Sequence, residues 1–319
     1  MGQRLDEAAR LTSDEAVLPG APVSVPPRVG KRVSRAFTRR WLALTSLLTA
    51  PVAWLMVVYV GSLIALVAVA LFKLDGRTQR PTTSFTGDNL RQAFTQSEFL
   101  KVVGQSLGAA VAVTALSVLI AVPVTFCVAR LLPRWMRRGV VVAFLLPLWA
   151  GYLVKAYAWK AMLRQGSKFG VDQAGGFLQS TFGWSPGFGW LAVILSLTYL
   201  WLPYMLLPVY TGMERLPNSL VEASSDLGAK PLRTFASVAM PMLIPAIAAG
   251  SIFTFSLSLG DYIIPGIIGN STLYIGQVVY MQQGTAGNLP FAAAFSLVPI
   301  LIIAVYLMVA KRLGAFDAL

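Results

Sequence analysis

The sequence predicts an all-α, polytopic membrane protein with about six transmembrane helices, and its composition is the first observation that predicts this. Of the 319 residues, 56% are hydrophobic and 12% are charged, whereas about a quarter of the residues of a soluble domain are charged. The mean hydropathy is +0.68. These values exclude a soluble enzyme and a disordered chain, and the single cysteine, Cys127, excludes an internal disulfide framework.

The second observation is a series of six apolar stretches, each close to the roughly twenty residues that a helix needs to cross a bilayer. The first lies within residues 41–72 and starts near Pro51, and the others cover about 102–129, 139–159, 190–213, 237–264 and 290–310. Together they predict a transmembrane domain over residues 46–312. We expect residues 1–45 to form a flexible basic cytoplasmic arm, and residues 313–319 to form a short cytoplasmic tail.

The third observation is the distribution of the 26 Lys and Arg residues. Most of them fall on one side of the predicted spans, in the N-terminal arm and at 130–138, 215–233 and 311–312. The connection 263–289, on the other side, has none. Because cytoplasmic loops carry the excess of Lys and Arg, we expect a multi-pass protein with both termini in the cytoplasm.

Prolines lie within or at the edge of nearly every predicted span: Pro123, Pro147, Pro203, Pro208, Pro241, Pro245 and Pro299. Each proline removes a backbone donor and disturbs the helix. In a membrane such breaks are tolerated where other helices or a water-filled cavity satisfy the freed groups. Ordinary kinks in a packed bundle explain any single proline, whereas a translocation pathway lined by bent helices would explain the set.

The loop between the fourth and fifth spans predicts a short amphipathic helix. Pro217, Asn218 and Ser219 are typical of a helix start and Gly228 of a helix end. The spacing places four side chains on a common face: Leu220, Ala223, Ser224 and Leu227. Two carboxylates four residues apart project from another face: Glu222 and Asp226. Pro231 suits the first turn of the helix that enters span five, so a partner docked on this loop could push the spans.

At this loop the chain resembles a known family. Glu222-Ala223-Ser224, then Gly228, then Val238-Ala239-Met240-Pro241 is similar to the EAA motif of ABC importer permeases, the binding-protein-dependent inner-membrane components. The chain departs from that motif at Ser224, Val238 and Met240, which are small or apolar replacements. The resemblance covers roughly residues 45–312. It implies a type I ABC importer permease (MetI-like) fold in the cell inner membrane.

The resemblance also implies a coupling helix at about 216–229 that docks on an ATPase. The residues it implies for that contact are Leu220, Glu222, Ala223, Ser224, Asp226, Leu227 and Gly228. Gly228 would allow the sharp turn between two helices. The chain has no P-loop of its own, because Gly30-Lys31 is followed by Arg32. We therefore expect ATP and Mg to be bound by separate ABC ATPase subunits, with no catalytic residue, metal site or cofactor in this chain.

Within the family, the chain looks most similar to the spermidine/putrescine permease branch. The segments that carry this likeness are 146–149, 157–159, 202–210, 260–265 and 275–280. They imply import of a polyamine, with a second, non-identical permease and an extracytoplasmic binding protein as partners and no role for nucleic acid. Other permeases of this kind carry aminobutyrate, phosphonates, thiamine or iron complexes, and these solutes stay open as alternatives.

Two other classes of function are weighed against an ABC permease. An ATP-independent secondary transporter would need its own coupling-ion site, yet acidic residues deep in the spans are nearly absent. An intramembrane enzyme would have little chemistry available, since the chain has no histidine and no carboxylate pair within its spans.

The candidate substrate residues lie near the predicted outer ends of the spans. Asp261 is the acidic residue within the apolar run of span five, where an ionisable group usually faces a cavity or a partner. It could attract a cation, and aromatic rings could add cation–π contacts: Tyr262, Tyr204, Trp149 and Tyr157. The alternative is structural, with Asp261 as a cap at the headgroup level and the rings in an interfacial belt.

Overall fold

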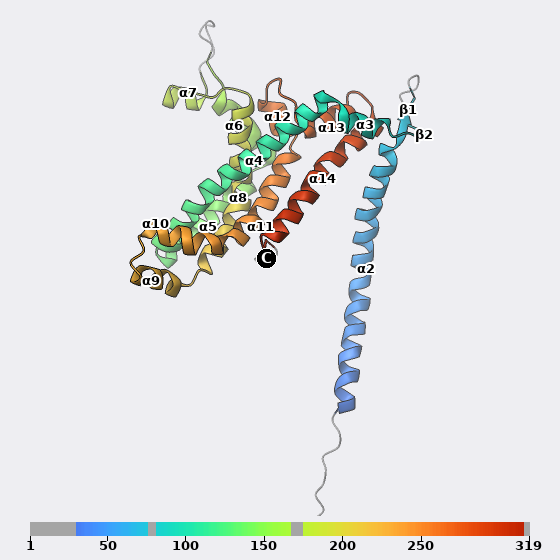
Figure 1. Ribbon diagram of the computed structural model, residues 1–319. Coiled ribbons are helices and arrows are strands. Elements are labelled where there is room, and N and C mark those ends of the chain that lie inside the picture. The colour runs from blue at the N-terminus through green and yellow to red at the C-terminus, as the bar shows by residue number, and fades with distance from the viewer. Residues whose placement is uncertain (1–29, 76–80, 167–174, 316–319) are drawn as a thin grey trace, which may run out of the picture. The chain divides into compact units, whose positions relative to one another are not determined.

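The computed structural model describes residues 30–75, 81–166 and 175–315 (Figure 1). It divides into two compact units, Met1–Ser62 and Leu63–Leu319. The helices are α2 (Gly30–Ala70), α3 (Asp88–Thr95), α4 (Ser97–Phe126), α5 (Arg134–Trp149), α6 (Tyr152–Leu163), α7 (Phe177–Phe182), α8 (Trp190–Glu214), α9 (Asn218–Asp226), α10 (Pro231–Thr234), α11 (Met240–Leu259), α12 (Ile263–Ile268), α13 (Ile275–Gln283) and α14 (Leu289–Arg312). Strands β1 (Phe72–Leu74) and β2 (Pro81–Phe85) form an antiparallel pair.

Helix α2 begins earlier than the sequence predicts. Residues 30–45, which we expected within the flexible arm, are helical and continuous with the apolar segment Leu47–Ala70. Arg, Lys, Ala and Leu are good helix formers, and residues 31–45 contain no Gly or Pro that would separate them from the apolar segment. The rest of the predicted arm, residues 1–29, and the end of the predicted tail, residues 316–319, lie outside the described residues.

The prediction of about six spans is confirmed in number. Among the described residues, five helices are long and apolar enough to cross a membrane: Leu47–Ala70, Ser97–Leu131, Trp190–Glu214, Pro231–Leu259 and Leu289–Arg312. A sixth is possible if α5 and α6 are counted together. Span five ends at Leu259, short of the predicted Ile264, so Asp261 lies in the turn after the helix.

The third span is not the single helix that we predicted. Between α5 and α6 the chain bends by 92°, and Ala150 and Gly151 at the bend have extended backbone ψ angles. Pro147 has no N–H to bond within α5. The Lys155 ammonium on α6 turns back and donates to the Pro147 carbonyl at 3.0 Å. Lys155 therefore supplies a hydrogen-bond donor to one of the carbonyl groups at the end of α5.

Helix α8 forms the centre of the larger unit and packs against both α4 and α11. Small residues allow the close approach of α8 to α11. A Cβ added to Gly212 would lie 2.6 Å from the Ala246 Cβ, and one added to Gly250 would lie 2.9 Å from the Met205 sulfur. A shift of α11 is therefore expected to move α8 with it.

The two ends of α8 contact different groups of elements (Figure 1). At its start, the Gly189 amide donates to the Ile268 carbonyl of α12 at 2.9 Å, and α12 also contacts α6. At its other end the chain passes directly into α9 and α10. The predicted coupling helix, at about 216–229, and the Asp261 region are thus at opposite ends of one central helix.

Two π-helical turns lie beside α9, the predicted coupling helix. One covers Cys127–Leu131 after α4, and the other covers Phe235–Ala239 between α10 and α11. The Phe126 and Phe235 rings meet edge to face at 5.9 Å, so the two turns are neighbours. Such turns are frequent at functional sites in helices, and here they lie between the region of α9 and the two spans that contain α4 and α11.

Candidate functional site

Helix α9 has a well-defined start and end. Pro217 precedes its first residue with extended backbone geometry. At its end Gly228 has φ +77°, its amide donates to the Ser225 carbonyl at 2.8 Å, and the Ala229 amide donates to the Ser224 carbonyl at 3.1 Å. This pair of bonds is a Schellman motif, which needs a left-handed residue at the position of Gly228. The predicted helix and turn are present, with bounds of Asn218–Asp226 inside the expected 216–229.

The two leucines of the predicted common face of α9 are exposed. Leu220 is 44% exposed and Leu227 is 89% exposed, and Ala223, Glu222 and Asp226 are exposed as well. The half-buried positions of this helix are instead Val221 and Ser224. The predicted common face therefore packs only partly on this chain, and most of it forms a surface of mixed apolar and acidic character.

Ser224 is the place where the chain departs from the EAA motif, and it makes a specific contact. Its hydroxyl lies 2.9 Å from the Thr234 hydroxyl of α10, and Thr234 is 8% exposed. An alanine at this position could not make this bond. The bond ties α9 to the start of the helix that leads into span five.

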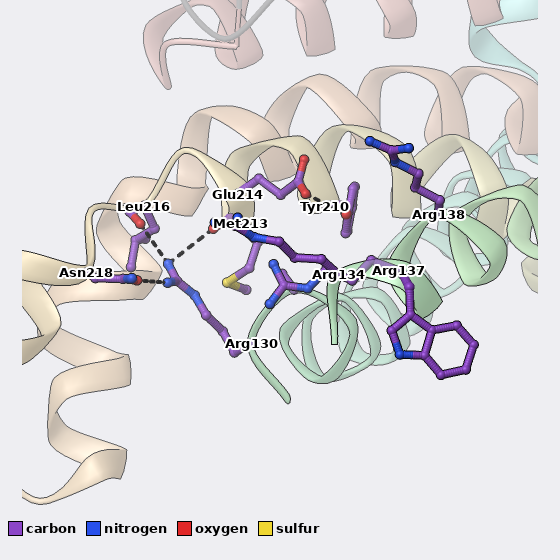
Figure 2. Close-up of a pocket in the computed structure, with 11 residues that line it drawn as sticks. Arg130, Arg134, Arg137, Arg138, Tyr210, Met213, Glu214, Leu216 and Asn218 are labelled. Carbon is purple, nitrogen blue, oxygen red and sulfur yellow. Dashed lines mark hydrogen bonds between the residues drawn. The ribbon is translucent and has the colours of Figure 1, made fainter. Parts of the chain in front are cut away.

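Arg130 holds the other end of α9, a role that sequence reasoning missed. From the π-helical turn after α4, its guanidinium donates to the Leu216 carbonyl at 2.7 Å, to the Met213 carbonyl at 3.3 Å and to the Asn218 side-chain oxygen (Figure 2). Met213 is at the end of α8 and Asn218 is the first residue of α9. One side chain thus joins α4, α8 and α9. No sequence pattern distinguished Arg130 from its basic neighbours.

A cavity of about 960 Å³ opens beside this contact (Figure 2). Four arginines line it: Arg130, Arg134, Arg137 and Arg138. In the described part of the chain its lining has one carboxylate, Glu214, which accepts a hydrogen bond from the Tyr210 hydroxyl at 2.6 Å. The cavity therefore has an excess of positive charge.

At the other end of α8, Asp261 is 8% exposed and well bonded. One carboxylate oxygen accepts from the Ile263 amide at 2.9 Å and from the Ile264 amide at 3.0 Å. The other accepts from the Tyr152 hydroxyl. Asp261 therefore makes the capping contacts that we set beside a substrate role, here at the start of α12.

The predicted aromatic residues are only partly brought together. Tyr204 is linked to Asp261 through a series of rings, since Tyr204 and Tyr152 each lie 5.9 Å from Trp201. Tyr262 stacks on Tyr280 at 5.1 Å instead. A cavity of about 280 Å³ is lined by eight residues: Tyr152, Trp201, Ser256, Leu257, Gly260, Asp261, Tyr262 and Ile263.

The other two candidates lie apart from this cavity. Trp149 is 88% exposed and Tyr157 is 57% exposed, and neither lines the cavity at Asp261. Tyr152 and Trp201 do line it and were missed by sequence reasoning. The Trp201 indole nitrogen is buried and has no hydrogen-bond partner among the described residues. The only available signal was the presence of further aromatic residues in the same spans.

Comparison with known proteins gives the family. Residues 139–315 match the model of the binding-protein-dependent transport system inner membrane component. The chain is 44% identical over 313 residues to the inner membrane ABC transporter permease protein YdcU of Escherichia coli, covering 92% of this chain and 96% of that one. It is 29% identical over 237 residues to the spermidine/putrescine transport system permease protein PotB of Escherichia coli, covering 72% and 82%.

Solved structures agree on the fold. A chain of a bacterial alginate ABC transporter, solved in complex with an alginate pentasaccharide-bound periplasmic protein, superposes with a TM-score of 0.65 at 13% identity. It covers 90% of this chain and 99% of that one. A chain of the MetNI methionine ABC transporter in an inward-facing conformation gives 0.51 at 16% identity, covering 69% and 95%. The predicted permease fold is confirmed, and the chain belongs to the family of binding-protein-dependent transport system inner membrane components, as a permease subunit of an ABC importer.

Proposed function

We propose that this permease subunit forms part of the translocation pathway for a small polyamine, spermidine or putrescine, delivered by an extracytoplasmic binding protein. ABC ATPase subunits, which bind the ATP and Mg, drive transport, and a second, non-identical permease completes the pathway. The similarity to the PotB permease supports the substrate class. The concentration of Lys and Arg at the α9 side supports cytoplasmic termini.

The observation that carries the coupling role is the exposed face of α9. Leu220 and Leu227 are exposed beside Glu222 and Asp226, on a helix whose ends are both fixed. Large apolar side chains at an interface contribute most when a partner buries them. We infer that the ATPase receives this face in a groove, with Glu222 at the contact.

The contacts of α9 suggest how its movement would reach the spans. The Arg130 guanidinium joins the start of α9 to α4 and α8. The Ser224–Thr234 bond joins its second half to α10. A displacement of α9 is therefore shared among three spans, and a rigid-body rocking of this kind is a known mode of alternating access.

For the substrate, we propose that the cavity at Asp261 receives the cation as it enters. Asp261 supplies negative charge, and the Tyr152, Trp201 and Tyr262 rings around it can add cation–π attraction. Tyr204 extends this series of rings along α8 toward Phe253, whose ring is 6.1 Å away. We propose that Trp149 and Tyr157, which are exposed, contact the solute only if the second permease subunit places them at the pathway.

The test is ATP-dependent uptake of labelled spermidine and putrescine by proteoliposomes that contain the complete transporter. Glu222→Lys should abolish uptake while the subunit still inserts and assembles. Glu98→Lys is the matched control, because Glu98 is an exposed carboxylate in the first turn of α4, near the other end of the bundle. Uptake that survives Glu222→Lys, or that is lost equally in the control, would contradict the coupling role.

A second candidate solute is a zwitterion such as aminobutyrate, and one observation favours it. The buried Trp201 indole N–H has no acceptor among the described residues. A fully protonated polyamine offers only donors, whereas the carboxylate of an amino acid would supply the missing acceptor when entry of the solute uncovers this N–H. Uptake of labelled aminobutyrate and of labelled spermidine, each measured with and without the other solute unlabelled, distinguishes the two, since only the true solute should be taken up and should inhibit at low concentration.

A further inference from the structure

We call the cavity lined by Arg130, Arg134, Arg137 and Arg138 the arginine cavity. Neither the proposed coupling to the ATPase nor the proposed solute accounts for this cavity. Arg130 is used in the contact with α9, and the Arg137 Nε donates to the Leu132 carbonyl at 2.9 Å. Arg134 and Arg138 are exposed on the first two turns of α5, and Glu214 is the one carboxylate in the described lining. Four guanidinium groups around a space of about 960 Å³ repel one another unless an anion enters.

The chemistry of the guanidinium group narrows the kind of anion. Its planar fork of donors matches the oxygens of a phosphate or carboxylate in a bidentate arrangement. With four guanidinium groups and one carboxylate, the described lining has an excess of donors, which suits the several oxygens of a phosphate group.

The face of α5 next to the cavity indicates where the phosphate group comes from. At 100° per residue, Trp135, Arg138, Val142 and Leu146 fall within an arc of about 80°. Trp135 is 79% exposed, Val142 is 59% exposed and Leu146 is 60% exposed. We call this surface the α5 stripe. A tryptophan beside arginines, followed by apolar side chains, is typical of the boundary between headgroups and hydrocarbon.

The length of the α5 stripe also fits a lipid. From Arg138 to Leu146 the helix rises about 12 Å, which lies within the roughly 15 Å of hydrocarbon in one leaflet. A phosphate at the arginine cavity would therefore place an acyl chain along Val142 and Leu146. A soluble phosphate would make no contact with the apolar part of the stripe.

We propose that the arginine cavity binds the headgroup phosphate of an anionic phospholipid, whose acyl chain lies along the α5 stripe. The lipid belongs to the leaflet on the α9 side. It would hold the start of α5 beside the end of α8, next to the contact between Arg130 and α9. The proposal rests on the membrane location of this permease subunit. It does not depend on which solute is transported or on the proposed coupling to the ATPase.

The experiment titrates the detergent-solubilised complete transporter with phosphatidylglycerol or phosphatidylcholine and counts bound lipids by native mass spectrometry. The double variant Arg134→Gln, Arg138→Gln leaves the structural bonds of Arg130 and Arg137 in place. The matched control is Lys311→Gln, Arg312→Gln, which removes the same charge from exposed positions at the end of α14, on the same side of the membrane.

We expect one tightly bound phosphatidylglycerol, little binding of phosphatidylcholine, and about 30-fold weaker phosphatidylglycerol binding in the double variant, from about a factor of five per arginine. The control should bind as the unmodified protein does. Equal loss in the control, or no loss in the double variant, would overturn the proposal. Displacement of the lipid by millimolar inorganic phosphate would assign the cavity to a free anion. Loss of the ATPase or the second permease from the double variant, without a change in bound lipid, would assign the cavity to a protein interface. Either result would also overturn the proposal.

Discussion

Replacement of Gly228 tests whether the turn after α9 must have its left-handed geometry. Gly228 has φ +77°, and a Cβ added there would meet no atom within 4 Å. The cost of Gly228→Ala is therefore conformational strain alone, about 1–2 kcal/mol for an L-residue in this region. That free energy corresponds to a reduction of about five- to thirty-fold in the equilibrium constant between molecules with α9 ended as observed and molecules with another turn geometry.

The assay is the initial rate of ATP-dependent uptake in proteoliposomes, normalised to the amount of assembled complex. Asparagine tolerates left-handed geometry and β-branched residues do not, so uptake should fall in the order Gly, Asn, Ala, Val at position 228. Gly287 is the matched control, because it has φ +65° and equally open surroundings but lies in the loop before α14. Equal losses for Gly228→Ala and Gly287→Ala, or an unchanged rate for Gly228→Val, would refute the reasoning.

Three further predictions concern side chains around the two sites. Arg130→Gln removes charge-assisted bonds from a partly exposed guanidinium, so we expect a loss of about 2 kcal/mol in stability and about tenfold slower uptake. Arg130→Lys should be intermediate in both thermal unfolding and uptake. Unchanged uptake would contradict the role of Arg130 in joining α9 to α4 and α8. Ser224→Ala leaves the Thr234 hydroxyl without this partner and should cost about 1 kcal/mol, whereas adding Thr234→Val should restore the melting temperature; additive losses would argue against the bond. Asp261→Asn keeps an oxygen for the α12 amides but removes the charge, so uptake of a polyamine should fall at normal expression. Asp261→Ala should also lower stability by about 1 kcal/mol. Equal uptake by Asp261→Asn and the unmodified protein would leave Asp261 with its structural role alone.

Much of the fold follows from local sequence. Apolar length predicted the spans, and α8 and α14 agree with the prediction to within a residue or two, because lipid requires every backbone group in a span to be bonded within a helix. The turn at Gly228 was also predictable, since glycine adopts the left-handed geometry of a helix end with little strain.

The contacts between distant segments could not be predicted in this way. At the bend between α5 and α6, the Lys155 ammonium donates to the Pro147 carbonyl. A single lysine in an apolar run does not indicate such a contact. Arg130 meets Asn218 across 88 positions of sequence, and its basic neighbours look the same in the sequence. The outward direction of Leu220 and Leu227 was also hidden, because helical spacing shows which residues share a face but not what that face contacts.

The measurement that tests the coupling role most directly is site-specific cross-linking from α9 in the assembled transporter. Cys127, the single native cysteine, is first replaced by serine, and cysteine is then introduced at Leu227, on the exposed face, or at Val221, on the half-buried face. We predict that Leu227→Cys forms a cross-link to the ATPase subunit and that Val221→Cys does not. A Leu227→Cys that reacts only with reagents dissolved in the lipid, or that never cross-links to the ATPase, would contradict the account.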